Sequence, residues 1–158
     1  MLLEVFKMFL SKVNNAYAHI KGGKNYPNID GDVYFKSTKD GVVVTAKIHG
    51  LPQSQNKCKG RVFGFHIHEG NSCTGNNEDE FANTGMHYNP NNCPHPYHLG
   101  NLPPLIENDG YAYMSVLINK FKIKDIIGKT IIIHDSPDDF TSQPSGNAGA
   151  KIACGIIE

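Results

Sequence analysis

Seven short runs of β-type residues, separated by turns, constrain the fold of this chain more than any other feature. The runs are rich in Val, Ile, Tyr, Phe and Thr and are bounded by Gly, Pro, Asn and Asp, a pattern typical of strands joined by turns. They read AYAHI, GDVYF, GVVVTAKIHG, RVFGFHIHE, YAYMSVL, KTIIIHD and KIACGII. Such spacing predicts an all-β sandwich or barrel, and a length of 158 residues suits one domain.

Two stretches break this rhythm and are expected to be long loops. Residues 70–105 and 135–149 are rich in Asn, Gly, Pro and His. Loops of this length inside a compact domain are usually functional or disordered. Because most histidines of the chain gather in and beside them, we expect functional loops.

The histidines are clustered, since six of the eight fall between His66 and His134. His66 and His68 are two residues apart in a strand-like run, so their side chains project from the same face of the sheet. Three more histidines and an asparagine follow in MHYNPNNCPHPYHLGN, and the run TIIIH ends on the sixth: His87, His95, His98, Asn101 and His134. Clustered imidazoles suit zinc or copper rather than calcium or magnesium. A solvated loop that happens to be rich in histidine is the alternative.

Charge and hydropathy narrow the choice of partners. Fifteen Lys and Arg residues balance fifteen Asp and Glu residues, so no overall field favours nucleic acid or an anionic membrane, and a small partner is expected.

Residues 1–15 place apolar side chains at helical spacing, interrupted by Glu4 and Lys7. This predicts a short amphipathic helix at residues 1–13, within an N-terminal extension at residues 1–15 ahead of a domain at residues 16–158, and neither a signal peptide nor a membrane span.

Five motifs, in the order found here, resemble the copper,zinc superoxide dismutase family. They are GFHIHEG, GMHYNP, HLGNLP, IIIHD with DD shortly after, and GNAGAKIACGII. The resemblance runs from about residue 16 to the C-terminus. It implies an eight-stranded Greek-key β-barrel, copper and zinc as cofactors, and superoxide as the substrate. The implied reaction disproportionates superoxide to dioxygen and hydrogen peroxide while copper cycles between Cu(II) and Cu(I).

The resemblance also implies a role for each matching residue. Four histidines would hold copper, and three histidines with one asparagine would hold zinc, one histidine being shared. The copper set is His66, His68, His87 and His134, and the zinc set is His87, His95, His98 and Asn101. The shared His87 would bridge the metals and act in catalysis as a proton carrier. Asp138 would orient one copper histidine and one zinc histidine through hydrogen bonds.

Two positions depart from the family pattern. Asn101 stands where the zinc site has an aspartate, and because it brings no negative charge, zinc should bind more weakly or leave this position to water. Lys151 stands where the substrate channel has an arginine, and it keeps the charge without the planar fork. We expect Lys151 to attract the substrate anion, giving a modest rate with weak salt dependence; a surface lysine without a catalytic part is the alternative.

The four cysteines lack C-x-x-C spacing, which argues against a zinc ribbon or a redox dithiol. The resemblance implies a disulfide between Cys73 and Cys154. For Cys58 and Cys93, free thiols and a second disulfide both stay open, and Cys93 could coordinate metal beside His95. The implied disulfide favours an extracytoplasmic or surface-associated location, although cytosolic members of the family keep theirs too.

Two other functions compete with the enzyme. The chain could bind copper and zinc on the same fold without catalysis, since fold does not imply function and two site positions are altered. It could also be an extracellular or spore-surface interaction protein that attaches through its N-terminal extension. The presence of all four copper-type histidines favours the enzyme. The short second loop and HLGNLP resemble bacterial members, and a homodimer is compatible with the family.

Overall fold

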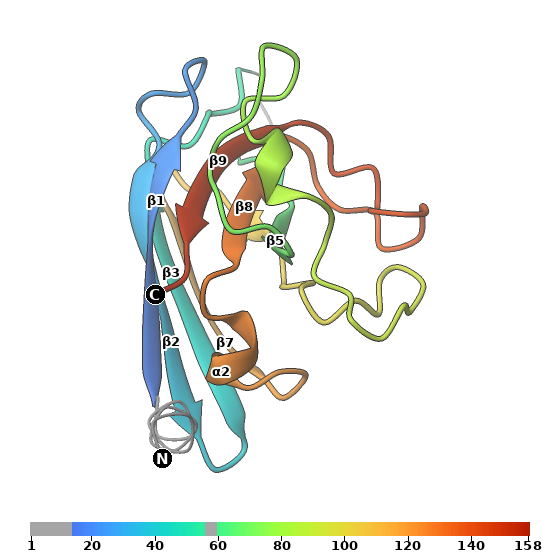
Figure 1. The fold of residues 1–158 in the computed structure, drawn as a ribbon. Coiled ribbons are helices and arrows are strands. Elements are labelled where there is room, and N and C mark those ends of the chain that lie inside the picture. Colours follow the sequence, from blue (N-terminus) through green and yellow to red (C-terminus); the bar gives the residue numbers. More distant parts are fainter. Residues whose placement is uncertain (1–13, 56–59) are drawn as a thin grey trace.

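One curled antiparallel sheet forms the body of the computed structural model, which describes residues 14–55 and 60–158 (Figure 1). The predicted helix at residues 1–13 and Cys58 lie outside the described residues. Seven strands lie in the order β5-β8-β9-β1-β2-β3-β7, and β4 and β6 form a separate pair. The strands are β1 Asn15–Gly22, β2 Asp30–Thr38, β3 Gly41–His49, β4 Val62–Phe63, β5 Phe65–His68, β6 Leu105–Ile106, β7 Ala112–Ile118, β8 Thr130–His134 and β9 Lys151–Ile156. Two short helical turns accompany them, η1 at Ala82–Thr84 and α2 at Ile123–Ile126.

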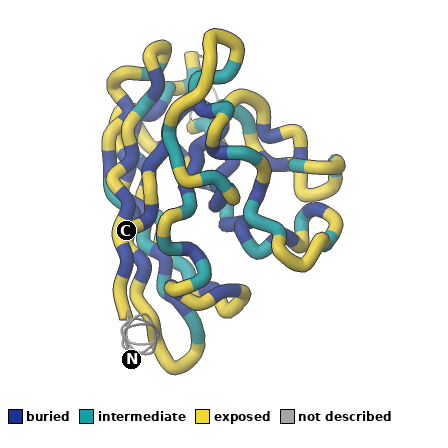
Figure 2. The backbone as a smooth tube through the Cα atoms, viewed as in Figure 1, coloured by how far each residue is buried: buried dark blue, intermediate teal, exposed yellow. Residues whose placement is uncertain are grey.

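The inner face of the sheet holds the hydrophobic core. Buried and exposed residues alternate along β1, β2 and β3 (Figure 2), as expected when one face of a strand packs inward and the other meets solvent. Ile20, Phe35 and Ile48 are among the buried side chains, and β8 is buried along its whole length. The predicted all-β class is therefore confirmed.

The predicted run RVFGFHIHE forms two strands rather than one. β4 pairs with β6, whereas β5 pairs with β8. Gly64 separates them: its N–H donates to Ser136 at 2.8 Å and its carbonyl accepts from the N–H of His134 at 2.8 Å. A Cβ at this position would lie 2.9 Å from the Cβ of Ala148. The second long loop thus approaches the sheet at Gly64, where the missing side chain leaves room. The nine strands form a seven-stranded sheet and a separate pair, rather than the single set of eight strands that was expected.

Both predicted long loops are present and lie on the same side of the molecule, next to β5 and β8 (Figure 1). The first joins β5 to β6 and contains η1, and the second joins β8 to β9. A disulfide between Cys73 and Cys154 anchors the first loop to β9, with a Cα–Cα distance of 5.7 Å. Phe81 packs in a small buried cluster with Ile132 and this disulfide. The loops are therefore fixed to the sheet on which the histidines lie.

Candidate metal centre

Six buried histidines meet where the first loop folds over the end of the sheet. Strand β5 supplies two of them, the end of β8 supplies one, and the first loop supplies three. Isolated backbone bridges dock the loop on β5, joining His68 to His87 and His66 to Asn101. No ring is more than 6% exposed: His66, His68, His87, His95, His98 and His134. The structure therefore gathers every histidine of the predicted set in one buried place.

The rings form two groups that share His87. His66, His68, His87 and His134 make the first group, and His87, His95 and His98 make the second, with the ligand atoms of each group within 4.8 Å of one another. In the first, Nε2 of His68 lies 3.2 Å from Nε2 of His134. In the second, Nδ1 of His98 lies 3.3 Å from Nδ1 of His87. Ring nitrogens that converge in this way can share a proton or bind one cation.

Asp138 lies between the two groups and holds one ring of each. Its Oδ2 is 2.7 Å from Nε2 of His66, and its Oδ1 is 2.8 Å from Nε2 of His95. The N–H of Phe140 also donates to Oδ1 at 2.7 Å. Gly146 packs against this carboxylate so closely that a Cβ there would lie 2.1 Å from Oδ1. The second loop thus holds one ring of each group in place through Asp138.

Backbone carbonyls orient two further rings of the first group. Nδ1 of His68 lies 2.9 Å from the carbonyl of Gly85, and Nδ1 of His134 lies 3.2 Å from the carbonyl of Gly149. A neutral imidazole carries one N–H, so a ring that donates it to such an acceptor presents a lone pair at its other nitrogen. For His68 and His134 that other nitrogen is Nε2, which points into the first group.

Three buried polar atoms of the centre have no hydrogen-bond partner among the described residues: Nδ1 of His66, Nε2 of His87 and Oδ1 of Asn101. An unpartnered buried polar atom costs free energy, on the order of 1–3 kcal/mol. Asn101 uses its Nδ2 to donate to the carbonyl of Pro96 at 3.0 Å. The two ring nitrogens are of the type that binds zinc and copper in proteins, whereas the amide oxygen of Asn101 is an uncharged, weaker ligand than a carboxylate. The residues present therefore fit the two metals.

Burial favours the neutral form of four of these rings. Desolvation, with the fields of neighbouring rings, lowers the pKa of His68, His87 and His98, and it lowers that of His134 to about 3. Burial by itself would raise the pKa of Asp138, but hydrogen bonds from His66, Phe140 and His95 lower it to about 2. At neutral pH these four rings are therefore unprotonated and Asp138 is a carboxylate, which are the states that metal binding requires.

Lys151 and Cys93 belong to neither histidine group. Lys151 pairs with His134 across β8 and β9, but its Nζ donates to Oδ2 of Asp79 at 2.8 Å and to the carbonyl of Phe81 at 3.1 Å. Cys93 is a half-buried free thiol, so the structure favours the free thiol over a second disulfide. The predicted pairing of Cys73 with Cys154 is confirmed.

Two contacts of the centre had no signal in the sequence. Gln143 hydrogen-bonds the backbone of His95, and Asp79 pairs with Lys151. The partners are 48 and 72 residues apart in the chain. Neither Gln143 nor Asp79 lies in a motif that marks it, so only the folded loops reveal them.

A family model described as copper/zinc superoxide dismutase (SODC) matches residues 29–157. The chain belongs to the copper/zinc superoxide dismutase family. Among curated relatives, "Superoxide dismutase [Cu-Zn]" of Actinobacillus pleuropneumoniae is 32% identical over 88% of this chain and 75% of that protein. "Superoxide dismutase [Cu-Zn]" of Pasteurella multocida is 35% identical over 74% of this chain and 72% of that protein.

Solved structures agree with this family assignment. The Cu/Zn superoxide dismutase from Brucella abortus matches with a TM-score of 0.76 at 26% identity, covering 91% of this chain and 99% of that one. A superoxide dismutase-like protein from Bacillus subtilis matches with a TM-score of 0.72 at 28% identity, covering 89% of this chain and 96% of that one. Copper and zinc are the cofactors of this family, and the two histidine groups fit them.

The part of the chain described by the structure contains no helix long and apolar enough to span a membrane.

Proposed function

We propose that this member of the superoxide dismutase family is an active enzyme that converts superoxide to dioxygen and hydrogen peroxide. In this proposal His66, His68, His87 and His134 hold copper. The zinc ligands are His87, His95, His98 and Oδ1 of Asn101. The observation that carries the proposal is the sharing of His87 between two buried groups of ring nitrogens.

His87 differs from the other rings of the first group because it hydrogen-bonds no carboxylate and no backbone carbonyl among the described residues. Its Nε2 is buried without a hydrogen-bond partner among the described residues, and its Nδ1 faces Nδ1 of His98 at 3.3 Å. A ring in this position can be a ligand on both sides or carry a proton on Nε2. His87 is therefore the residue that would deliver a proton to the peroxide product.

Copper held by the first group would supply one-electron oxidation and reduction of superoxide, and zinc held by the second group would supply a fixed positive charge. The protein residues contribute orientation and charge. Asp138 and the carbonyls of Gly85 and Gly149 hold the rings of His66, His68 and His134 in place. Lys151, opposite His134 in the sheet, would attract the substrate anion.

The decisive experiment is superoxide dismutation by purified protein loaded with copper and zinc. Metal content per chain is determined on the same sample, and His134→Ala is the control because it removes a ring of the first group only. We expect copper-dependent activity that is lost in this variant while zinc stays bound. Full copper loading without dismutation would reject the proposal.

A non-enzymatic metal-binding role is the second candidate, and one observation favours it. The ammonium group of Lys151 already has a carboxylate partner 2.8 Å away, and Asn101 brings no charge to the second group. Tight binding of both metals without turnover would support this role.

We also propose an oxidising, extracytoplasmic compartment for the protein. The disulfide between Cys73 and Cys154 is of a kind that persists outside reducing compartments. We further propose that residues 1–15 form an extension and residues 16–158 form the domain. We also propose that the protein associates into a homodimer.

A further inference from the structure

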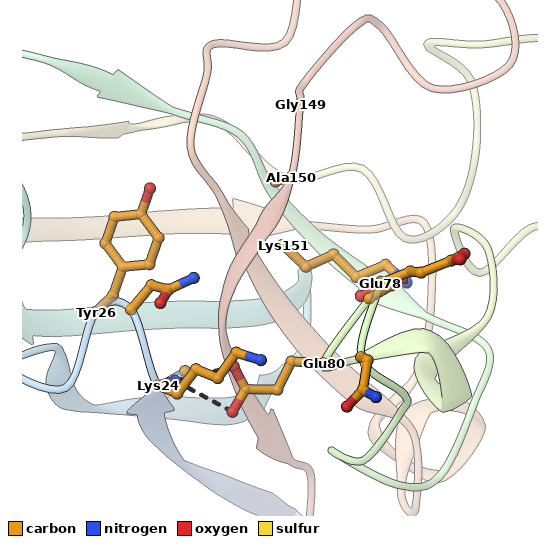
Figure 3. Close-up of a pocket in the computed structure, with 11 residues that line it drawn as sticks. Lys24, Tyr26, Glu78, Glu80, Gly149, Ala150 and Lys151 are labelled. Atoms are coloured by element: carbon orange, nitrogen blue, oxygen red, sulfur yellow. Dashed lines mark hydrogen bonds and ion pairs between the residues drawn. The ribbon is translucent and has the colours of Figure 1, made fainter.

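A cavity of about 530 Å³ opens beside the metal centre, and Lys151 forms part of its wall. Figure 3 shows the Lys151 side chain extended across this cavity towards the segment that carries Glu78. Gly149 lines the same cavity, and its carbonyl lies 3.2 Å from Nδ1 of His134. One residue of backbone therefore separates the cavity from the first histidine group, so a charge inside the cavity is felt at that group.

Lys151 lies opposite His134, a ring of the first group, across β8 and β9. Its Nζ, however, is paired with Asp79 at 2.8 Å. The two side chains are 15% and 42% exposed, so water screens this pair only in part. An anion approaching the centre thus meets an ion pair rather than a free cation.

Asp79 is held in place by its own loop. Its Oδ1 accepts the N–H of Phe81 at 2.9 Å, which leaves Oδ2 for Lys151. The backbone N–H of Asp79 donates to Oδ1 of Asn76 at 2.9 Å, and its carbonyl accepts the N–H of Asn76 at 2.9 Å. Phe81 packs beside the Cys73–Cys154 disulfide. The carboxylate is therefore a fixed partner to which the flexible lysine is tied.

We propose that Asp79 is a positioning residue which neutralises and restrains Lys151 and so limits how strongly this centre attracts small anions. This inference rests on the proposed function and names a regulator of the same site. Removing the carboxylate turns the field of an ion pair into that of a single positive charge. The attraction of an anion then reaches further and depends more steeply on salt.

Two other acidic side chains line the cavity, and one of them offers a control. Glu80 accepts the backbone N–H of Lys24 at 2.9 Å with Oε2 (Figure 3), so its replacement would disturb the loop. Glu78 makes no side-chain hydrogen bond or ion pair with any described residue. Glu78→Gln therefore removes the same charge, one residue from Asp79, without touching Lys151.

The test compares Asp79→Asn with Glu78→Gln, because asparagine keeps an oxygen for the N–H of Phe81. Azide, as a small anion, is titrated against each copper- and zinc-loaded protein and followed by visible absorption. We expect roughly two- to tenfold tighter azide binding in Asp79→Asn at low ionic strength, with the gain falling as salt is added. Dismutation rates should follow the same order. Equal azide affinity in Asp79→Asn and Glu78→Gln would overturn the inference.

A second measurement needs no metal. Limited acetylation with acetic anhydride, read by peptide mass spectrometry, should modify Lys151 faster in Asp79→Asn than in the parent protein or in Glu78→Gln. Asp79→Ser, which also keeps an oxygen acceptor for the turn, should repeat the result. An unchanged rate at Lys151 in both Asp79 variants would show that Asp79 does not restrain it.

A double-mutant cycle separates this role from a general effect of charge. In a Lys151→Met background, Asp79→Asn should change azide affinity no more than Glu78→Gln does. A full gain without Lys151 would contradict the inference. Absence of dismutation in the loaded parent protein would reject the proposed function, yet azide affinity and acetylation would still decide the role of Asp79.

Discussion

The side-chain amide of Gln143 hydrogen-bonds the backbone of His95 in both directions. Its Oε1 accepts the N–H of His95 at 2.9 Å, and its Nε2 donates to the carbonyl of His95 at 2.8 Å. Asp138, five residues earlier in the same loop, holds the ring of His95 at 2.8 Å. The second loop therefore fixes both the backbone and the ring of a residue in the second histidine group.

Replacing Gln143 should weaken zinc binding more than copper binding. Gln143→Ala removes both backbone contacts of His95, while the rings of the first group keep their own partners. By analogy with the loss of other groups that orient metal ligands, we expect about tenfold weaker zinc affinity. Competition with a chromogenic chelator measures the affinity of each metal. Gln53→Ala, an exposed glutamine on another loop, is the matched control, and equal zinc affinity in both variants would contradict the prediction.

Asn101→Asp should strengthen zinc binding. Oδ1 of Asn101 is buried without a hydrogen-bond partner among the described residues, so a carboxylate oxygen at this position would add a negative charge where zinc is expected. We expect at least about tenfold tighter zinc binding, since one pair of opposite charges at close range contributes more than about 1.4 kcal/mol even when water screens it in part. Asn108→Asp makes the same change on an exposed turn. Similar zinc affinity in the two variants would remove Asn101 from the ligand set.

The metal-free protein should lose stability as the pH falls below about 6.5. Burial and the nearby His66 lower the pKa of His134 from 6.5 to about 3. Between these values the unfolded chain takes up a proton at this ring and the folded chain does not. The free energy of unfolding should therefore drop by about 1.4 kcal/mol per pH unit for such a group. Above pH 6.5 the contribution of His134 to the free energy of unfolding is fully present. Below pH 3 no further stability is lost through this ring.

Urea unfolding at a series of pH values measures this dependence. His134→Gln should flatten the slope between pH 6 and 4 by up to about 1.4 kcal/mol per pH unit. Parallel curves for His134→Gln and the parent protein would mean that His134 does not titrate with a lowered pKa.

The sequence carried enough information to predict the β architecture and the gathering of the histidines. Alternating apolar residues defined the strands because one face of each strand is buried. The two long loops were marked by their composition, and His66 and His68 by their spacing in one strand. The division of one predicted strand at Gly64 was missed, because the close approach of Ala148 depends on how the second loop returns to the sheet.

What the sequence could not predict depends on contacts between the loops. Lys151 was expected to offer a free positive charge, and nothing near it in the chain indicates a partner. Asp79 reaches it because the disulfide and Phe81 hold the first loop against β8 and β9. The amide of Gln143 finds His95 in the same way. Such pairs form only in particular conformations of the two loops, and these conformations cannot be predicted from local residue pattern and spacing.

Removing the disulfide should destabilise the protein and release Asp79 together with the first loop. Cys73 and Cys154 are 81 residues apart, and the loop-entropy model assigns roughly 4–5 kcal/mol to closing a loop of this length. The double variant Cys73→Ser/Cys154→Ser should lower the free energy of urea unfolding of the metal-free protein by up to this amount.

Cys93→Ser is the matched control for this prediction, because Cys93 is a free thiol and its replacement breaks no cross-link. A serine variant of Cys93 that destabilised the protein as much as the double variant would show that loss of a thiol, and not of the cross-link, is responsible.

If the disulfide also positions Asp79, Lys151 should be acetylated faster in the double variant even under conditions where the variant remains folded. Unchanged acetylation in the folded double variant would mean that Phe81 and the hydrogen bonds of Asn76 hold Asp79 without the disulfide.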